Sequence, residues 1–262
     1  MRRSPFRNVT GSHLADPGAV RRVVAIARAL NPAYLLAHLF ITMSLKLVQF
    51  PWSTYSMVTR AILRFGGIQH EIINIPPLDR SLPWRLSGHR SYRVPLLVDD
   101  DAPVVESDHD TQVIARYLDE RFKLGLFPAH LDGVQTILWR YIENEVEDPA
   151  FRLNDIYFRE WLPEDEQLRH LQYKERRFGP SCIDQWSRSQ SALLDQLTDR
   201  LEPFEFMLAH HAFLLDESPR FVDLDLAAML ECFLWSGRYE LPAKLPRVRD
   251  WHQRINAAAC SS

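Results

Sequence analysis

Two serines, Ser53 and Ser56, stand where a strand is expected to turn into a helix. The apolar run at residues 45–50 predicts a buried strand, and apolar residues recur at helical spacing from Tyr55 to Phe65. The N-terminus of a helix has free backbone N–H groups and the positive end of the helix dipole, and both favour a bound anion. The hydroxyl groups at this turn could therefore stabilise a thiolate.

The elements around this turn follow the order β-α-β and then β-β-α. Residues 68–75 predict a second strand, which a βαβ unit places parallel to the first. Residues 94–98 and 104–105 predict a hairpin, and residues 108–122 predict an amphipathic helix. This order, with Pro95 at the start of the third strand, indicates a thioredoxin-like arrangement.

Three motifs in this arrangement resemble the glutathione transferase superfamily. They are the turn PWSTYS at residues 51–56, the tripeptide RVP at 93–95 and the helix sequence DTQVIARYLDERF at 110–122. The resemblance covers about residues 45–255, and the segment 174–186 is similar to a bacterial branch that includes the lignin β-etherase-like proteins. It implies that glutathione is the co-substrate and that the protein is a homodimer.

The resemblance assigns Ser53 to the catalytic position of the serine-type members. The thiol of glutathione has a reference pKa of ~8.5, and a hydroxyl that donates to the sulfur at a helix N-terminus favours the thiolate. The alternative is that Ser53 only caps the helix, because serine is a preferred capping residue. Thr54 replaces the usual proline, and the phenol of Tyr55 is a second, less favoured donor. Ser56 is expected to be a structural residue of the first helical turn.

The resemblance also implies a backbone site for glutathione at Val94 and Pro95. The corresponding bond in the family is cis, and the backbone of the residue before proline pairs with the cysteinyl part of glutathione. The alternative is an ordinary trans proline at the start of a strand. Arg93 could reach the glycyl carboxylate of the tripeptide.

The family binds the γ-glutamyl group with an acidic residue followed by Ser or Thr at a helix N-terminus. This chain has two such pairs. Glu106-Ser107 directly follows the fourth strand, whereas Asp110-Thr111 has the expected spacing to the helix. We favour Asp110-Thr111, and the other pair would then have ordinary capping chemistry.

Composition excludes several other classes of protein. The 262 residues are 46% apolar and 25% charged, as in an ordinary globular protein, and 31 basic against 34 acidic residues indicate no nucleic-acid partner. Cys182, Cys232 and Cys260 are too widely spaced for a zinc cluster, so no metal is implied, and a reducing cytoplasm is expected. None of them is near Ser53 in sequence, which disfavours thiol–disulfide exchange.

Residues 1–42 differ from the rest of the chain. A basic, irregular stretch precedes an apolar one, but polar residues and a proline interrupt the apolar part, so there is no run of ~20 apolar residues for a membrane anchor. Since Met43-Ser44 stands directly before the first strand, we interpret residues 1–42 as a disposable extension or an over-extended gene start. No membrane partner is expected.

The second half of the chain is predicted to be helical. We expect a thioredoxin-like domain at residues 45–122, a linker at 123–132 and an all-α domain at 133–255. Residues 224–235 are apolar on nearly all sides, which predicts a central buried helix. Asp223 before it should bond backbone N–H groups.

The same half offers walls for an apolar pocket. Aromatic residues are frequent there, although each is more often core than pocket lining: Trp139, Tyr157, Phe158, Trp161 and Trp186. The cationic run at 174–177 is expected to be a solvated helix face, with a carboxylate-bearing substrate as the alternative.

These features predict a glutathione S-transferase-like enzyme of detoxification. Ser53 would stabilise the thiolate, which attacks a small electrophile held by the helical half. Glutathione-dependent cleavage of an aryl ether is a second hypothesis. A non-catalytic binding or assembly module is a third, which Thr54 and the offset acidic pair favour.

Overall fold

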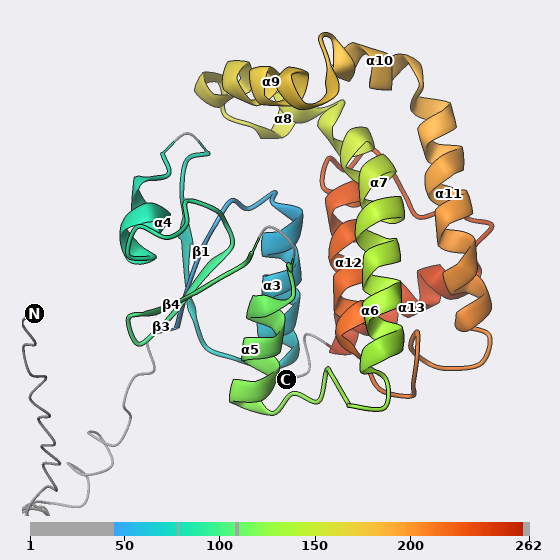
Figure 1. The fold of residues 1–262 in the computed structure, drawn as a ribbon. Coiled ribbons are helices and arrows are strands. Elements are labelled where there is room, and N and C mark those ends of the chain that lie inside the picture. The colour runs from blue at the N-terminus through green and yellow to red at the C-terminus, as the bar shows by residue number, and fades with distance from the viewer. Residues whose placement is uncertain (1–44, 78, 108–109, 259–262) are drawn as a thin grey trace, which may run out of the picture. The chain divides into compact units, whose positions relative to one another are not determined.

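The computed structural model describes residues 45–77, 79–107 and 110–258 (Figure 1). The interpretations of residues 1–42 and of Cys260 lie outside these ranges. Within them, no helix is both long enough and apolar enough to span a membrane. The described residues form a sheet with helices on both faces, followed by a helical region, so the predicted thioredoxin-like and all-α arrangement is confirmed.

The sheet has four strands in the order β2-β1-β3-β4. β1 (Leu45–Gln49) is parallel to β2 (Glu71–Asn74) and antiparallel to β3 (Leu96–Asp99), which pairs with β4 (Ala102–Val105). The parallel pairing of β1 and β2 confirms the predicted βαβ unit. Asp100 and Asp101 both have positive φ values in the tight turn between β3 and β4.

Helices cover both faces of this sheet. α3 (Thr54–Phe65) and α5 (Val113–Phe122) lie on the face toward the helical region, and α4 (Ser81–Leu86) lies on the other (Figure 1). β1 supplies both cores, because Leu47 packs with the helices and Val48 packs in a smaller cluster with side chains of α4. Each fully buried side chain of this kind contributes about 1.5–3 kcal/mol.

Three predicted boundaries were wrong. β2 begins at Glu71 rather than at residue 68, and β3 begins at Leu96 because Pro95 has no N–H to donate to a ladder. α5 begins at Val113 rather than at residue 108. The carboxylate of Asp110 accepts the backbone N–H of Gln112 at 2.9 Å, and this local bond competes with helix formation.

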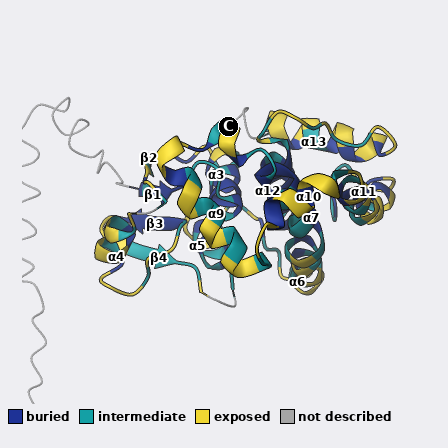
Figure 2. Ribbon diagram, turned by 90° about the horizontal axis from the view of Figure 1, so that it is seen from above, coloured by how far each residue is buried: buried dark blue, intermediate teal, exposed yellow. Residues whose placement is uncertain are grey.

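The helical region begins with α6 (Asp132–Tyr141), a π-helical turn η1 (Ile142–Val146) and α7 (Glu147–Asp155). The remaining helices are α8 (Phe158–Trp161), α9 (Glu164–Phe178), α10 (Cys182–Arg188), α11 (Gln190–Met207), α12 (Phe221–Leu234) and α13 (Pro246–Ala258). α12 packs against both α3 and α7, and only Glu231 and Leu234 of its residues are not buried (Figure 2). Its predicted central position is confirmed.

Asp223 has the structural role expected for it. It is fully buried, and its carboxylate accepts hydrogen bonds from the backbone N–H groups of Leu214 at 2.8 Å and Arg220 at 2.9 Å. The indole Nε1 of Trp251 donates to it at 2.9 Å. One carboxylate thus holds the start of α12 to the preceding loop and to α13.

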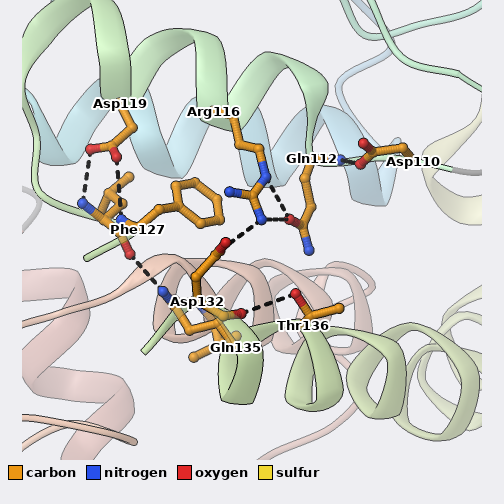
Figure 3. Close-up of polar contacts among 10 residues, drawn as sticks. Asp110, Gln112, Arg116, Asp119, Phe127, Asp132, Gln135 and Thr136 are labelled. Atoms are coloured by element: carbon orange, nitrogen blue, oxygen red, sulfur yellow. Dashed lines mark hydrogen bonds and ion pairs between the residues drawn. The ribbon is translucent and has the colours of Figure 1, made fainter. Parts of the chain in front are cut away.

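The connection from α5 to α6 is held by side chains of α5 (Figure 3). The carboxylate of Asp119 accepts the backbone N–H groups of Leu126 at 2.8 Å and Phe127 at 3.2 Å. The guanidinium of Arg116 donates to Asp132 at 2.9 Å and lies 4.3 Å from the centre of the Phe127 ring. These contacts fix where the helical region begins relative to the sheet.

Candidate functional site

The turn between β1 and α3 opens into a cavity of about 640 Å³. Ser53 is the N-cap residue of α3, with extended backbone angles, and it lines the cavity. Its carbonyl accepts the N–H of Met57 at 2.9 Å, but its side chain makes no capping hydrogen bond. The hydroxyl is therefore not used as a helix cap, which was the structural alternative for this residue.

Ser56 does not share this environment. Its side chain is fully buried, its Oγ has no hydrogen-bond partner among the described residues, and it does not line the cavity. The expectation that Ser56 is a structural residue of the first turn is confirmed, and its hydroxyl is not available to an anion in the cavity. Three residues along a helix rotate the side chain by most of a turn, and Ser56 faces the packed side of α3.

Tyr55 lines the cavity, but its hydroxyl is engaged. It donates to Glu147 Oε2 at 3.1 Å. Burial first, and then the nearby charges of Glu147 and Glu143, raise the pKa of Tyr55. Because a phenol has one proton to donate, Tyr55 is not a second donor to a sulfur in this arrangement.

Cys232 is a cavity residue that the sequence analysis missed. α12 places it against the N-terminus of α3, where it contacts the side chain of Thr54 and lines the same cavity as Ser53. Cys232 is far from Ser53 along the chain, so the sequence did not indicate that the two are close in space. The apolar helix around Cys232 indicated only that this residue is buried. Burial raises the pKa of the Cys232 thiol to about 12, so it is protonated at neutral pH and cannot supply a thiolate.

A group of buried and half-buried carboxylates lies beside the turn, and the sequence analysis missed it too. Burial raises the pKa of Glu147 to about 7 and raises that of Asp225 well above its ordinary value. Glu143 accepts the hydroxyl proton of Thr111. Glu143 lies within η1, and Glu147 directly follows it. Their two carboxylates therefore bond this part of the helical region to Thr111 and Tyr55.

The bond between Val94 and Pro95 is cis, which confirms that prediction. Pro95 is buried, Val94 is half-buried against the smaller core, and Arg93 is exposed. None of the three lines the cavity beside Ser53.

The two acidic pairs have different surroundings. The carboxylate of Glu106 accepts the N–H groups of Val113 at 2.9 Å and Ile114 at 3.2 Å, so Glu106 caps α5. Burial raises the pKa of Glu106 to about 8, although these bonds act in the opposite direction. The exposed Ser107 donates its backbone N–H to the carbonyl of Asp110 at 3.2 Å. Neither pair lines the cavity, and residues 108 and 109 between them lie outside the described ranges.

Aromatic side chains form one wall of the cavity. The rings of Phe50 and Trp52 stack with centroids 5.7 Å apart, and Trp161 lies 5.7 Å from Trp52. Of the helical-region aromatics named above, Trp161 lines the cavity, whereas Trp139, Phe158 and Trp186 are buried in the core.

α9 forms the adjoining part of the lining, and Figure 1 shows it lying across one end of the sheet and the helical region. The prediction of a solvated face at residues 174–177 was wrong for Lys174. Its side chain is 13% exposed, forms an ion pair with the buried Asp155, and lies 4.5 Å from the Phe151 ring. Arg176 and Arg177 are exposed, and they line the cavity together with Arg169.

Residues 52–121 match the family model described as "Glutathione S-transferase, N-terminal domain". Among solved structures, glutathione transferase GSTFuA3 from Phanerochaete chrysosporium is 18% identical, with a TM-score of 0.70 over 82% of this chain and 97% of that chain. Glutaredoxin 2 from Salmonella typhimurium, in complex with glutathione, is 16% identical, with a TM-score of 0.64 over 84% and 96%. A glutathione S-transferase from Pseudomonas fluorescens is 17% identical, with a TM-score of 0.59 over 81% and 94%. At these identities the structural likeness concerns the fold.

Proposed function

We propose that this protein binds glutathione and activates its thiol at Ser53. The chain has the fold of the glutathione S-transferase superfamily, and residues 52–121 match that superfamily's N-terminal domain. One observation carries this proposal. Ser53 is the N-cap residue of α3 and lines a cavity, and its hydroxyl makes no capping hydrogen bond. The neighbouring hydroxyls of Tyr55 and Ser56 are respectively bonded to a carboxylate and buried.

The chemistry follows from this position. The Ser53 hydroxyl and the N-terminus of α3 stabilise the glutathione thiolate, and the thiol proton leaves to solvent. The sulfur then attacks an electrophilic carbon, a C–S bond forms, and the leaving group departs with the bonding electron pair. Each pKa unit by which the thiol is acidified corresponds to about 1.36 kcal/mol.

The rest of glutathione would lie along the edge of the sheet domain. The backbone of Val94 before the cis Pro95 pairs with the cysteinyl part, and Arg93 binds the glycyl carboxylate. Asp110-Thr111 binds the γ-glutamyl group, which is supported by the use of the Glu106 carboxylate as the cap of α5. A homodimer and a cytoplasmic location stay predictions from the superfamily.

The test is the ultraviolet absorbance of the glutathione thiolate, titrated against pH in the presence of the protein. For the wild type we expect a thiol pKa well below ~8.5, and for Ser53→Ala a return toward that value. Ser56→Ala is the matched control, because its buried hydroxyl does not line the cavity. Glutathione binding with an unshifted pKa, or no binding, would refute the transferase proposal in favour of a binding module.

Cleavage of an aryl ether is the second candidate, and the aromatic wall of the cavity favours it. The rings of Phe50, Trp52 and Trp161 provide a surface for an aryl group beside Ser53. The same attack on the ether-bearing carbon would release an aryloxide as the leaving group. A turnover screen with aryl ethers and aryl halides separates the two reactions.

A further inference from the structure

The charged residues of α9 that line the cavity are mostly cationic. Four cationic side chains of α9 line the cavity: Arg169, Lys174, Arg176 and Arg177. Glu166 is the one acidic residue of α9 in the lining, and the other acids of this helix, Glu164, Asp165 and Glu175, do not line it. Arg80 adds a fifth cation from the sheet domain, 4.2 Å from the centre of the Phe50 ring.

The lining has few acidic residues, and two of them already have partners. Asp155 forms ion pairs with Lys174 and, at 3.4 Å, with His170, and Glu147 accepts the Tyr55 hydroxyl. Glu166 is the third acid of the lining, and burial raises its pKa. The lining therefore has an excess of positive charge.

The arginines of α9 are available to a ligand. The side chains of Arg169 and Arg176, seven residues apart on one face of the helix, make no ion pair or hydrogen bond within the described part of the chain. Arg177 donates to the hydroxyl of Tyr173 at 3.3 Å, and Glu147 is the charged group that faces it. A guanidinium group matches a carboxylate with two parallel hydrogen bonds.

The part of the lining next to α9 is aromatic. Trp52 stacks on Phe50 with an interplanar angle of 14°, and Trp161 from α8 closes against it. A ring that lies on these side chains would have a substituent beside α9, because Trp161 itself contacts His170 of α9 with ring centroids 5.9 Å apart. An aromatic surface beside a cationic wall is suited to an aromatic anion, because a cleft lined with charges of one sign concentrates ions of the other sign.

We propose that the electrophile of this protein is an aromatic compound that carries a carboxylate group. The carboxylate binds Arg169 and Arg176, and the ring lies against the surface formed by Trp52 and Trp161. This inference rests on the proposed function. In the reaction the glutathione sulfur bonds to an activated ring carbon, the leaving group takes the bonding electrons of the broken bond, and the thiol proton goes to solvent; the carboxylate is unchanged.

The first experiment measures binding without glutathione, so it is independent of thiol activation. The probes are 3,5-dinitrobenzoate and its neutral amide, 3,5-dinitrobenzamide, titrated by calorimetry. We expect wild-type protein to bind the carboxylate about five- to tenfold more tightly than the amide, as two partly exposed charge-assisted contacts allow. Arg169→Gln/Arg176→Gln should remove this preference, because neither side chain has a partner whose loss would disturb the fold.

The control is Arg188→Gln/Arg249→Gln. These two arginines are exposed and outside the cavity lining, so this variant removes the same net charge and should keep the preference. Equal affinities of the wild type for carboxylate and amide, or the same loss in both double variants, would overturn the proposal.

The second experiment compares turnover of 4-chloro-3,5-dinitrobenzoate and its amide, each divided by its uncatalysed rate with glutathione. The ratio of the kcat/KM for the carboxylate to the kcat/KM for the amide should fall about five- to tenfold in Arg169→Gln/Arg176→Gln, with the affinity for glutathione unchanged. If this variant instead weakens glutathione binding and keeps the ratio, the arginines bind glutathione's own carboxylates and the proposal fails. If the protein prefers the carboxylate but does not acidify the glutathione thiol, the proposed function is refuted and the binding site for the carboxylate is confirmed.

Discussion

Glu147 gives the sharpest test of the electrostatics beside the turn. Its carboxylate lines the cavity and accepts the hydroxyl proton of Tyr55 at 3.1 Å. Burial, and to a smaller extent the charge of Glu143, raise the pKa of Glu147 to about 7, while the bond from Tyr55 and the charges of Arg177 and Lys174 oppose this. Replacing Glu147 with glutamine removes the charge and keeps an acceptor for the phenol.

The magnitude follows from linkage between proton binding and folding. A glutamate has an ordinary pKa of 4.5, and Glu147 in the folded protein has a pKa of about 7. The folded state therefore binds this proton more tightly, and the corresponding stability is fully present below pH ~4.5 and is lost as the pH rises through ~7. At 1.36 kcal/mol per pKa unit the loss is at most about 3 kcal/mol.

The assay is thermal unfolding of Glu147→Gln and wild type between pH 4.5 and 8.5. Near the acid end the two proteins should have similar stability. At pH 8 and above the variant should be more stable by up to about 3 kcal/mol, which for a chain of this length is a rise in Tm of roughly 6–12 °C. Glu120→Gln is the control, since this exposed glutamate of α5 does not line the cavity.

Two results would refute this reasoning. A Glu147→Gln variant that is less stable than wild type by the same amount at every pH would mean that Arg177 and Lys174 hold the ionised carboxylate favourably. A pH dependence equal to that of Glu120→Gln would mean that the pKa of Glu147 is not raised in the folded protein.

Three further predictions concern stability and reactivity. Asp223→Ala should cost about 3–5 kcal/mol in thermal unfolding, because it leaves three buried N–H donors without their acceptor; a loss under 1 kcal/mol would contradict the capping role. Ser56→Ala should lie within about 1 kcal/mol of wild type or be more stable, since it removes a buried hydroxyl with no partner in the described part of the chain; a larger loss would indicate an unrecognised bond. In a Cys182→Ser/Cys260→Ser background, which leaves Cys232 as the single thiol, Cys232 should resist a thiol reagent at pH 8 until denaturant is added, because burial raises its pKa to about 12. Labelling of the native protein would show the thiol to be accessible.

Local patterns predicted the elements that depend on neighbouring residues. The apolar run of β1 and the all-round apolar α12 were recognised, because a buried strand and a buried helix have short-range signatures. The cis bond before Pro95 was expected from the resemblance to the superfamily and not from the local pattern. The start of α5 was not predicted correctly. It depends on Glu106, seven residues before Val113, and on the local bond of Asp110, and either acidic pair satisfies the sequence pattern of a cap.

The sequence by itself determined that Ser53 stands at the N-terminus of a helix after a buried strand, because the turn is specified within a few residues. Only the tertiary structure decided which side chains of the turn meet the cavity. Side chains of a helix are distributed around its axis, and the packing of α12 on α3 buries Ser56 and brings Cys232 to Thr54. The cationic wall has the same origin, since Arg169 and Arg176 line the cavity only because the fold brings α9 to the turn after β1, more than a hundred residues away along the chain.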